Sequence, residues 1–336
     1  MMEPIEQIRD WLSSPRRIAI TTHHRPDGDA MGSSLGLYHY LKQGGHRVKV
    51  VVPTDYGDNL KWIPGTEDVL IGPNDADMAN WTFEGADLIF CLDFNSLDRI
   101  NEFATVVGDA DGKKIMIDHH LDPVGFEDVA FWDDTASSTA EMIYRLIVQL
   151  EGREKINLPI AEALYTGIVT DTGSFRFSST TPAVHCMVAH LLEVGVLSHK
   201  IHEAIYDNAS ESRLRFLGHC FTNCLFVRPE LRTAYVIVDK PVFKQFNVKA
   251  GETEGLVNYA LSLKDVRLAV LITAQDNMVK LSFRSRDNFP ANEFAQHFGG
   301  GGHFYAAGGK SMESLEETEK KMLGLLETYK DQLLAE

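Results

Sequence analysis

The stretch from Ile18 to Ala30, IAITTHHRPDGDA, decides the fold of the first half of the chain. Its first part, IAITT, is a short apolar run typical of a buried β-strand. A polar segment with two histidines and two aspartates follows. A helix is then expected from Ala30 to Gln43, because Gly44-Gly45 is a typical helix stop.

Strand and helix signals continue to alternate after this stretch. Further strands are expected at Arg47–Val52, Asp87–Leu92 and Lys113–Ile117, and further helices at Thr139–Leu150 and Pro159–Val169. Nearly continuous apolar runs suit strands that are buried on both faces. We therefore predict an α/β fold for residues 1–195, with an open, mainly parallel sheet and helices on both of its faces.

The second half of the chain has a different character. Residues 196–220 are predicted to hold a linker helix, Ser198–His219, and residues 221–336 a smaller α+β domain. Strands are expected at Leu231–Val238, Val266–Ala274 and Met278–Arg284, the last two forming an antiparallel hairpin. Helices are expected near 291–298 and over 314–334, and the apolar side of the last one suits either the core or a homodimer.

Composition narrows the classes of function. The 336 residues include 32 Lys and Arg against 48 Asp and Glu, a formal charge of −16. So acidic a chain is a poor partner for long duplex nucleic acid or an anionic membrane. Four cysteines are too few for a disulfide scaffold, and the sequence has neither an apolar signal segment nor an apolar run long enough to span a membrane. We therefore expect a cytoplasmic protein with reduced thiols.

Acidic residues and histidines follow the ends of the predicted strands. Four groups occur, at His23–Asp29, Asp93, Asp118–His120 and Asp171. Ligands of open α/β sheets bind at the carboxyl ends of the strands, so the first three groups should meet at one edge, with the fourth delivered by a helix end. Clustered carboxylates repel one another unless cations are bound. Two dications suit this set, and mixed oxygen and nitrogen donors favour manganese, with cobalt and magnesium as alternatives.

Each group taken alone has a plainer explanation. A single Asp after a strand is usually a turn residue or a helix N-cap, and Asp29 before Ala30 fits a cap. An isolated Asp-His-His is usually a solvated loop. The occurrence of four such groups in one α/β half is what favours a metal centre over these explanations.

The sequence resembles the DHH phosphoesterase family in four motifs that occur in the family's order. They are His23-x-x-Pro26-Asp27-x-Asp29-Ala30-x-Gly32-Ser33, then Asp93 with Arg99 downstream, then Asp118-His119-His120, and finally Thr166 to Phe175, TGIVTDTGSF. The segment Gly299-Gly300-Gly301-Gly302-His303 resembles the hallmark of the DHH-associated C-terminal domain. The resemblance covers nearly the whole chain.

The resemblance implies a dinuclear centre. One ion would be held by His23, Asp27 and Asp93, and the other by Asp29, Asp93, His119 and Asp171, so that Asp93 bridges the two. His120 would face the substrate, and His24 lies at a variable position. A water between two dications loses a proton near neutral pH, and the resulting hydroxide would attack phosphorus while protonated His120 assists the leaving oxygen.

The second domain is expected to select the substrate. Consecutive glycines let a ligand approach the backbone and can form an anion-binding concavity, although one glycine would suffice for a helix C-cap. Arg284 with His303 is expected to bind a phosphate, while Arg286 fits a solvated surface equally well. The predicted substrate residues are Arg284, Gly300, Gly301, Gly302 and His303. The segment Ala136–Thr139 could cap a helix, contact the substrate, or do both, and capping alone is the interpretation preferred here.

The function that the resemblance implies is manganese-dependent hydrolysis of very short oligoribonucleotides. Removal of the 3′-phosphate from adenosine 3′,5′-bisphosphate (pAp) is expected at the same site. The alternative is a phosphodiesterase for linear or cyclic dinucleotides such as pApA or cyclic di-AMP. A family II pyrophosphatase ranks lower because its second domain lacks the glycine-rich His segment, and a non-enzymatic nucleotide sensor ranks lower because no expected metal ligand is missing.

Overall fold

The computed structural model describes residues 3–249 and 251–335. The chain divides into two compact units, with the division after Asn208. We call the part before it unit 1 and the part after it unit 2. Each is built on its own six-stranded sheet.

The sheet of unit 1 is parallel throughout, in the order β3-β2-β1-β4-β5-β6. Its strands are β1 (Arg17–Thr22), β2 (Arg47–Val52), β3 (Leu70–Ile71), β4 (Leu88–Leu92), β5 (Lys113–Asp118) and β6 (Val129–Trp132). The chain adds β2 and β3 on one side of β1, then returns to add β4, β5 and β6 on the other side. The switch in direction therefore falls between β1 and β4, which is where open α/β sheets bind their ligands.

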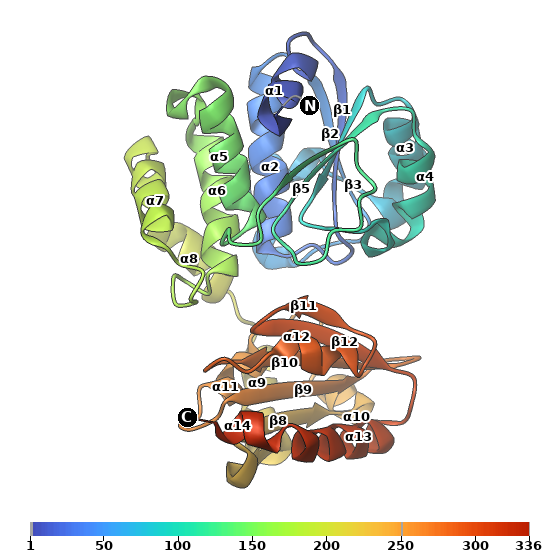
Figure 1. Ribbon diagram of the computed structural model, residues 1–336, viewed down its shortest axis with the longest axis vertical. Helices are drawn as coiled ribbons and strands as arrows, with labels where there is room; N and C mark the ends of the chain where they lie inside the picture. Colours follow the sequence, from blue (N-terminus) through green and yellow to red (C-terminus); the bar gives the residue numbers. More distant parts are fainter. Residues whose placement is uncertain (1–2, 250, 336) are drawn as a thin grey trace. The chain divides into compact units, whose positions relative to one another are not determined.

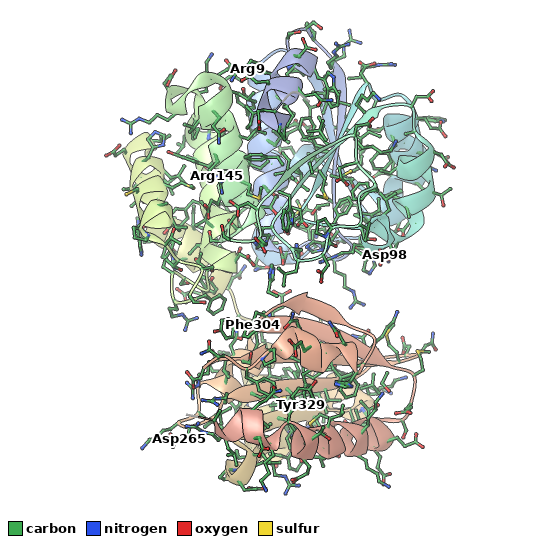
Figure 2. All side chains as sticks on the ribbon, viewed as in Figure 1. Arg9, Asp98, Arg145, Asp265, Phe304 and Tyr329 are labelled. Carbon is green, nitrogen blue, oxygen red and sulfur yellow. The ribbon has the colours of Figure 1, made fainter. Side chains whose placement is uncertain are left out.

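Helices cover both faces of this sheet, as the sequence predicts (Figure 1). One face carries α1 (Pro4–Trp11), α2 (Gly28–Gln43), α5 (Thr139–Glu151) and α6 (Leu158–Asp171), with α7 (Pro182–Val194) and α8 (Ser198–Tyr206) beyond; the other carries α3 (Gly72–Glu84) and α4 (Ala104–Asp109). Alternation along β1 serves both layers: Ile18 and Ile20 join the larger core, and Ala19 joins the smaller one. Figure 2 shows side chains filling both layers.

A close crossing of α2 and α6 holds the larger layer together. A Cβ atom on Gly32 of α2 would meet the backbone oxygen of Ala163 at 2.5 Å and the backbone nitrogen of Gly167 at 2.7 Å, both in α6. The two backbones therefore touch directly at this point. Because Asp29 lies one turn before Gly32 and Asp171 one turn after Gly167, the crossing also sets the separation of two acidic residues.

Unit 2 has a mixed sheet in the order β11-β12-β10-β9-β8-β7, antiparallel except for the parallel pair β8 and β9. Its strands are β7 (Leu225–Arg228), β8 (Thr233–Val238), β9 (Leu268–Ala274), β10 (Val279–Ser285), β11 (Gly301–His303) and β12 (Ala306–Ser311). One face packs on α9 (Glu211–His219), α10 (Lys240–Gln245) and α11 (Leu256–Leu261), the other on α12 (Ala291–Gln296), α13 (Leu315–Thr328) and α14 (Lys330–Leu334). The predicted hairpin is β9–β10.

Short helical segments complete the two units. They are 3-10 turns at Asp58–Leu60, Thr66–Asp68, Leu97–Phe103, Arg153–Lys155 and Pro229–Leu231, and a π-helical turn at Cys220–Cys224. No helix in the described part of the chain combines the length and the apolar character needed to cross a bilayer.

Two predicted helices are interrupted in the structure. The prediction of a single helix over Ser198–His219 is wrong, because α8 ends at Tyr206 and α9 begins at Glu211. The Ser210 side chain starts the second helix by accepting a hydrogen bond from the Arg213 amide. This break contains the division between the units. The expected tail helix is likewise two helices that meet at Tyr329, and its apolar residues Met322, Leu326 and Leu333 are buried in the core of unit 2.

The α2–α6 crossing predicts that Gly32→Ala destabilises unit 1. The added methyl group would press on backbone atoms of α6, and overpacking of this kind costs about 1–3 kcal/mol. Thermal denaturation followed by circular dichroism would show a lower midpoint. Gly324→Ala in α13 is the matched control, since its Cβ would meet nothing within 4 Å and should be neutral or slightly stabilising. Equal midpoints for the two variants would contradict the close crossing.

Candidate metal centre and substrate strip

The residues predicted to bind metal lie at one edge of the parallel sheet. β1, β4 and β5 are neighbours, and His23, Asp93 and His119 follow their carboxyl ends directly or within one residue. Asp29 is in the first turn of α2, and Asp171 is the last residue of α6. The structure therefore brings together the groups that the sequence placed at strand and helix ends.

The first group consists of His23, Asp27 and Asp93. His23 Nε2 lies 3.4 Å from Asp93 Oδ2 and 4.0 Å from Asp27 Oδ1. Asp27 is also the N-cap of α2, since its Oδ1 accepts from the backbone amides of Asp29 and Ala30. The capping role that the sequence would also allow for Asp29 thus belongs to Asp27.

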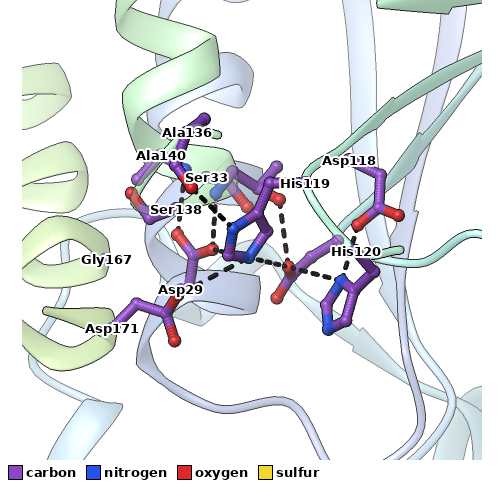
Figure 3. Close-up of polar contacts among 12 residues, drawn as sticks. Asp29, Ser33, Asp118, His119, His120, Ala136, Ser138, Ala140, Gly167 and Asp171 are labelled. Atoms are coloured by element: carbon purple, nitrogen blue, oxygen red, sulfur yellow. Dashed lines mark hydrogen bonds and ion pairs between the residues drawn. The ribbon is translucent and has the colours of Figure 1, made fainter. Parts of the chain in front are cut away.

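The second group consists of Asp29, His119 and Asp171 (Figure 3). His119 Nε2 lies 3.5 Å from Asp171 Oδ2 and 3.8 Å from Asp29 Oδ2. It is also 3.6 Å from Asp93 Oδ1. Asp93 thus points one carboxylate oxygen at His23 and the other at His119, which is the geometry of a residue shared by both groups.

The backbone of Asp93 is unusual for a residue other than glycine. Its φ is +65°, in the left-handed region, and its amide donates to the Ile117 carbonyl of β5 at 3.0 Å. Asp tolerates this conformation better than most residues, but such strain still costs on the order of 1 kcal/mol. The strained turn directs a fully buried carboxylate back across the ends of β4 and β5.

Electrostatics at this edge are dominated by buried carboxylates. Burial, together with the nearby carboxylates of Asp93 and Asp171, raises the pKa of Asp29 well above its usual value. For Asp93 burial acts in the same direction, but hydrogen bonds from His119 and His23 outweigh it and hold its pKa well below the usual value. The neighbouring carboxylates likewise overcome burial at His119 and His23, so that the pKa of each imidazole is raised.

These shifts test whether divalent cations fit the site. The raised pKa values of the two imidazoles and of Asp29 show that the concentrated negative charge favours the binding of protons there. A dication offsets the same charge and releases those protons. Each group gathers its ligand atoms within 4.8 Å of one another, and the donors are imidazole nitrogen and carboxylate oxygen, a set that manganese and similar ions accept. The residues present therefore fit two cations.

The N-terminus of α5 donates hydrogen bonds to two of the carboxylates, those of Asp29 and Asp93. The backbone amides of Thr139 and Ala140 donate to Asp29 at 2.6 and 2.8 Å, and Thr139 Oγ1 donates to Asp93 Oδ1 at 2.9 Å. Ser138 is the helix cap, accepting from the Glu141 amide. Capping was the interpretation made from sequence, and it missed Thr139 because nothing in the local pattern shows where that hydroxyl points.

Asp118 and His120 form a pair beside the metal groups. His120 Nδ1 lies 2.7 Å from Asp118 Oδ1 and 3.8 Å from Asp93 Oδ1. Asp118 is fully buried, and its Oδ2 makes no hydrogen bond in the described structure. The motif containing Asp118 was recognised from sequence, but no role was assigned to this residue. The structure shows that it holds the ring of His120.

His24, which the sequence left without a role, and Arg99 of the second motif are joined through the backbone. His24 donates its amide to the Arg99 carbonyl at 2.7 Å, and its Nδ1 lies 2.8 Å from Asn101 Nδ2. The positive charge of Arg99 disfavours the protonated form of His23. It therefore lowers the pKa of His23, in opposition to the carboxylates of Asp27 and Asp93, which raise it.

In unit 2 the predicted substrate residues lie on neighbouring strands. Arg284 of β10 is opposite Ala306 of β12, which is opposite His303 of β11. Directly paired residues point to the same face of a sheet, so Arg284 and His303 flank a single methyl group. The next row on this face is Ser282, Gly308 and Gly301, in which only Ser282 has a side chain beyond Cα. We call these two rows the substrate strip.

The glycines of the Gly299–Gly302 segment differ in how much space surrounds them. A Cβ on Gly300 would meet the Gly308 oxygen at 1.9 Å, and one on Gly302, whose φ is +140°, would meet the Ala306 oxygen at 2.6 Å. Packing against β12 therefore requires glycine at positions 300 and 302, whether or not a ligand binds. Gly301, in contrast, would meet no atom within 4 Å, which leaves space above the strip.

Arg286, which the sequence left undecided, has a structural role. Its guanidinium donates to the backbone oxygens of Val266 and Leu263, so it ties the end of β10 to the segment before β9.

Comparison with known proteins places the chain in a family. The model of the DHH family N-terminal domain matches residues 17–168, and the model of the DHHA1 domain matches residues 232–332. The chain belongs to the DHH family of phosphoesterases, as its four motifs indicated.

Two named relatives align along most of their length. The chain is 30% identical to the bifunctional oligoribonuclease and PAP phosphatase NrnA of Bacillus subtilis, over 93% of this chain and 94% of that protein. It is 33% identical to the protein of the same name from Thermus thermophilus, over 87% and 83% respectively. A crystal structure of an exopolyphosphatase-related protein from Bacteroides fragilis superimposes with a TM-score of 0.93 at 38% identity, covering 98% of this chain and 97% of that one.

The hydrogen bond from Thr139 to Asp93 predicts that Thr139→Val weakens metal binding. Valine keeps the shape but removes the donor, and loss of an outer hydrogen bond of this kind lowers metal affinity roughly tenfold or more. Isothermal titration with Mn²⁺ would measure the change. Thr135→Val, which removes the hydroxyl that donates to the surface residue Asp133, is the control. An unchanged Mn²⁺ affinity in Thr139→Val would show that Asp93 needs no such support.

Proposed function

We propose that unit 1 binds two divalent cations, with manganese preferred. His23, Asp27 and Asp93 would hold one ion, and Asp29, Asp93, His119 and Asp171 the other. The observation that carries the proposal is the division of the two Asp93 oxygens between His23 and His119, because a carboxylate aimed at two separate ligand groups suits a bridging role. Carboxylate-rich sites that hold two metals are a standard device for phosphoryl displacement.

We further propose that the protein hydrolyses very short oligoribonucleotides and removes the 3′-phosphate of pAp. Support comes from the names of the two relatives that align with nearly the whole chain, both oligoribonucleases and PAP phosphatases. The composition agrees, since a chain of net charge −16 offers no general attraction to long nucleic acid. In unit 2, Arg284 and His303 would bind a phosphate of the substrate over the floor formed by Gly301 and Gly308.

The chain's own residues account for the rest of the chemistry. Bound cations would activate water and offset negative charge on the phosphoryl group. Asp118 accepts a hydrogen bond from His120 Nδ1, which fixes the ring, so that in the doubly protonated imidazolium the Nε2 proton would be the one given to the leaving oxygen. Thr139 and the first amides of α5 keep Asp29 and Asp93 in place while charge changes at the site.

A substrate panel with Mn²⁺ tests the proposed activity. pAp and ribonucleotides of two to five residues are expected to be hydrolysed, with the rate lost in EDTA and restored by Mn²⁺. Asp93→Asn should reduce kcat/KM for pAp by at least about a thousandfold, since it removes the charge shared by both groups. Asp111→Asn, at an exposed loop position, is the control. Rapid cleavage of cyclic di-AMP alone would instead favour the cyclic dinucleotide activity.

The Asp118–His120 pair predicts a separate kinetic signature. Asp118→Asn keeps the volume but cannot hold the ring through a carboxylate, so kcat for pAp should fall roughly a hundredfold or more while Mn²⁺ affinity changes little. The kcat and KM values, with Mn²⁺ titration alongside, would check this. A loss of Mn²⁺ affinity equal to that of Asp93→Asn would mean that Asp118 serves the metal groups and not His120.

A further inference from the structure

Two lysines lie directly opposite each other in the sheet of unit 2. The register pairs Lys280 of β10 with Lys310 of β12, and both side chains are exposed. Like charges in directly opposite positions destabilise a sheet by a few tenths of a kcal/mol up to about 1 kcal/mol. On its other side, Lys280 is paired with Thr273 of β9. The register thus places two lysines side by side at this point, in a chain whose net charge is −16.

Protection of a sheet edge does not explain this pair. Lysines commonly discourage pairing of edge strands with other chains. In this sheet, however, the edges are β11 and β7, and β10 and β12 both have neighbours on either side. Lys280 thus lies on an interior strand, where that protection has no use. Lys310 lies beyond the part of β12 that pairs with β11, and its amide there already donates to the Phe298 carbonyl.

The lysine pair continues the substrate strip as a third row. Residues two apart on a strand face the same way, so Arg284, Ser282 and Lys280 share one face, together with Ala306, Gly308 and Lys310. Positive groups thus stand in the first and third rows, and the middle row has almost no side chains. Each step between rows is about 7 Å, because a strand rises about 3.4 Å per residue.

We propose that Lys280 and Lys310 form a second phosphate-binding subsite for single-stranded oligoribonucleotides. This inference rests on the proposed function and adds to it the substrate's length. A step of two residues along the strand is comparable with the extended repeat of a nucleic-acid backbone. The lysine row therefore lies about two repeats from Arg284 and His303, and the phosphate one repeat along lies over Ser282, Gly308 and Gly301.

The consequence is a preference that depends on length. pAp is too short to contact both charged rows, whereas an oligomer with several phosphates can contact both. Each phosphate contact by lysine adds affinity and makes binding weaken with salt. The lysine row should therefore raise the efficiency of hydrolysis for oligomers relative to pAp.

The test uses the full-length double variant Lys280→Gln, Lys310→Gln. Hydrolysis of pAp and of ribonucleotides from two to five residues is measured with Mn²⁺. The ratio of kcat/KM for the pentamer to that for pAp should fall roughly tenfold, because two ammonium groups no longer bind phosphate. The salt dependence of log kcat/KM for the pentamer should become shallower by about 0.7 for each phosphate that is no longer neutralised by a lysine.

The matched control is Lys320→Gln, Lys330→Gln. These exposed lysines lie on α13 and α14, which cover the opposite face of the same sheet, so the net charge changes equally. This control should leave the pentamer-to-pAp ratio unchanged. An unchanged ratio in the Lys280, Lys310 variant, or an equal loss in both double variants, would overturn the proposal.

Binding measured without hydrolysis separates this inference from the proposed activity. Fluorescence anisotropy with a labelled ribonucleotide pentamer in EDTA reports affinity alone. Weaker binding by the Lys280, Lys310 variant together with an inactive wild-type enzyme would overturn the proposed function and keep the subsite. If the wild-type enzyme is active and the wild type, the Lys280, Lys310 variant and the Lys320, Lys330 control all bind the pentamer equally well, the proposed subsite is wrong and the proposed function stands.

Discussion

The mutual repulsion of buried carboxylates is the interaction on which the structure of unit 1 depends. Asp29 and Asp93 are almost inaccessible, and Asp171 faces them across His119. Such a cluster costs free energy unless it is surrounded by compensating charge. Two imidazoles, the first amides of α5 and the Thr139 hydroxyl surround it in the protein itself, and a pair of cations would complete that compensation.

The packing of the helices serves this cluster. Because Gly32 and Gly167 allow α2 and α6 to touch at their backbones, the residues one turn away on each helix are brought to the same imidazole. The strained turn at Asp93 has a similar effect at the end of β4. Stability is thus given up at particular positions to hold acidic groups where cations can bind between them, which is a common feature of functional sites.

Much of the fold could be predicted from periodicity. The strands β1, β2, β4 and β5 lie within one residue of their predicted bounds, because a strand buried on both faces needs an almost unbroken apolar run. The edge strand β3 has only two residues and escaped prediction, as did β6. The break between α8 and α9 was missed because a charged, polar segment keeps its helical character whether or not Ser210 starts a new helix.

The sequence by itself determined the class of the fold, the family and which residue types gather at strand ends, since these depend on local patterns that survive without a structure. Only the tertiary structure decided how the two Asp93 oxygens are divided, that Thr139 and Asp118 support their neighbours, and that Gly301 differs from Gly300 and Gly302. These facts depend on distances between segments far apart in the chain. A local pattern carries no information about such distances, because side-chain directions and strand register are set by packing of the whole unit.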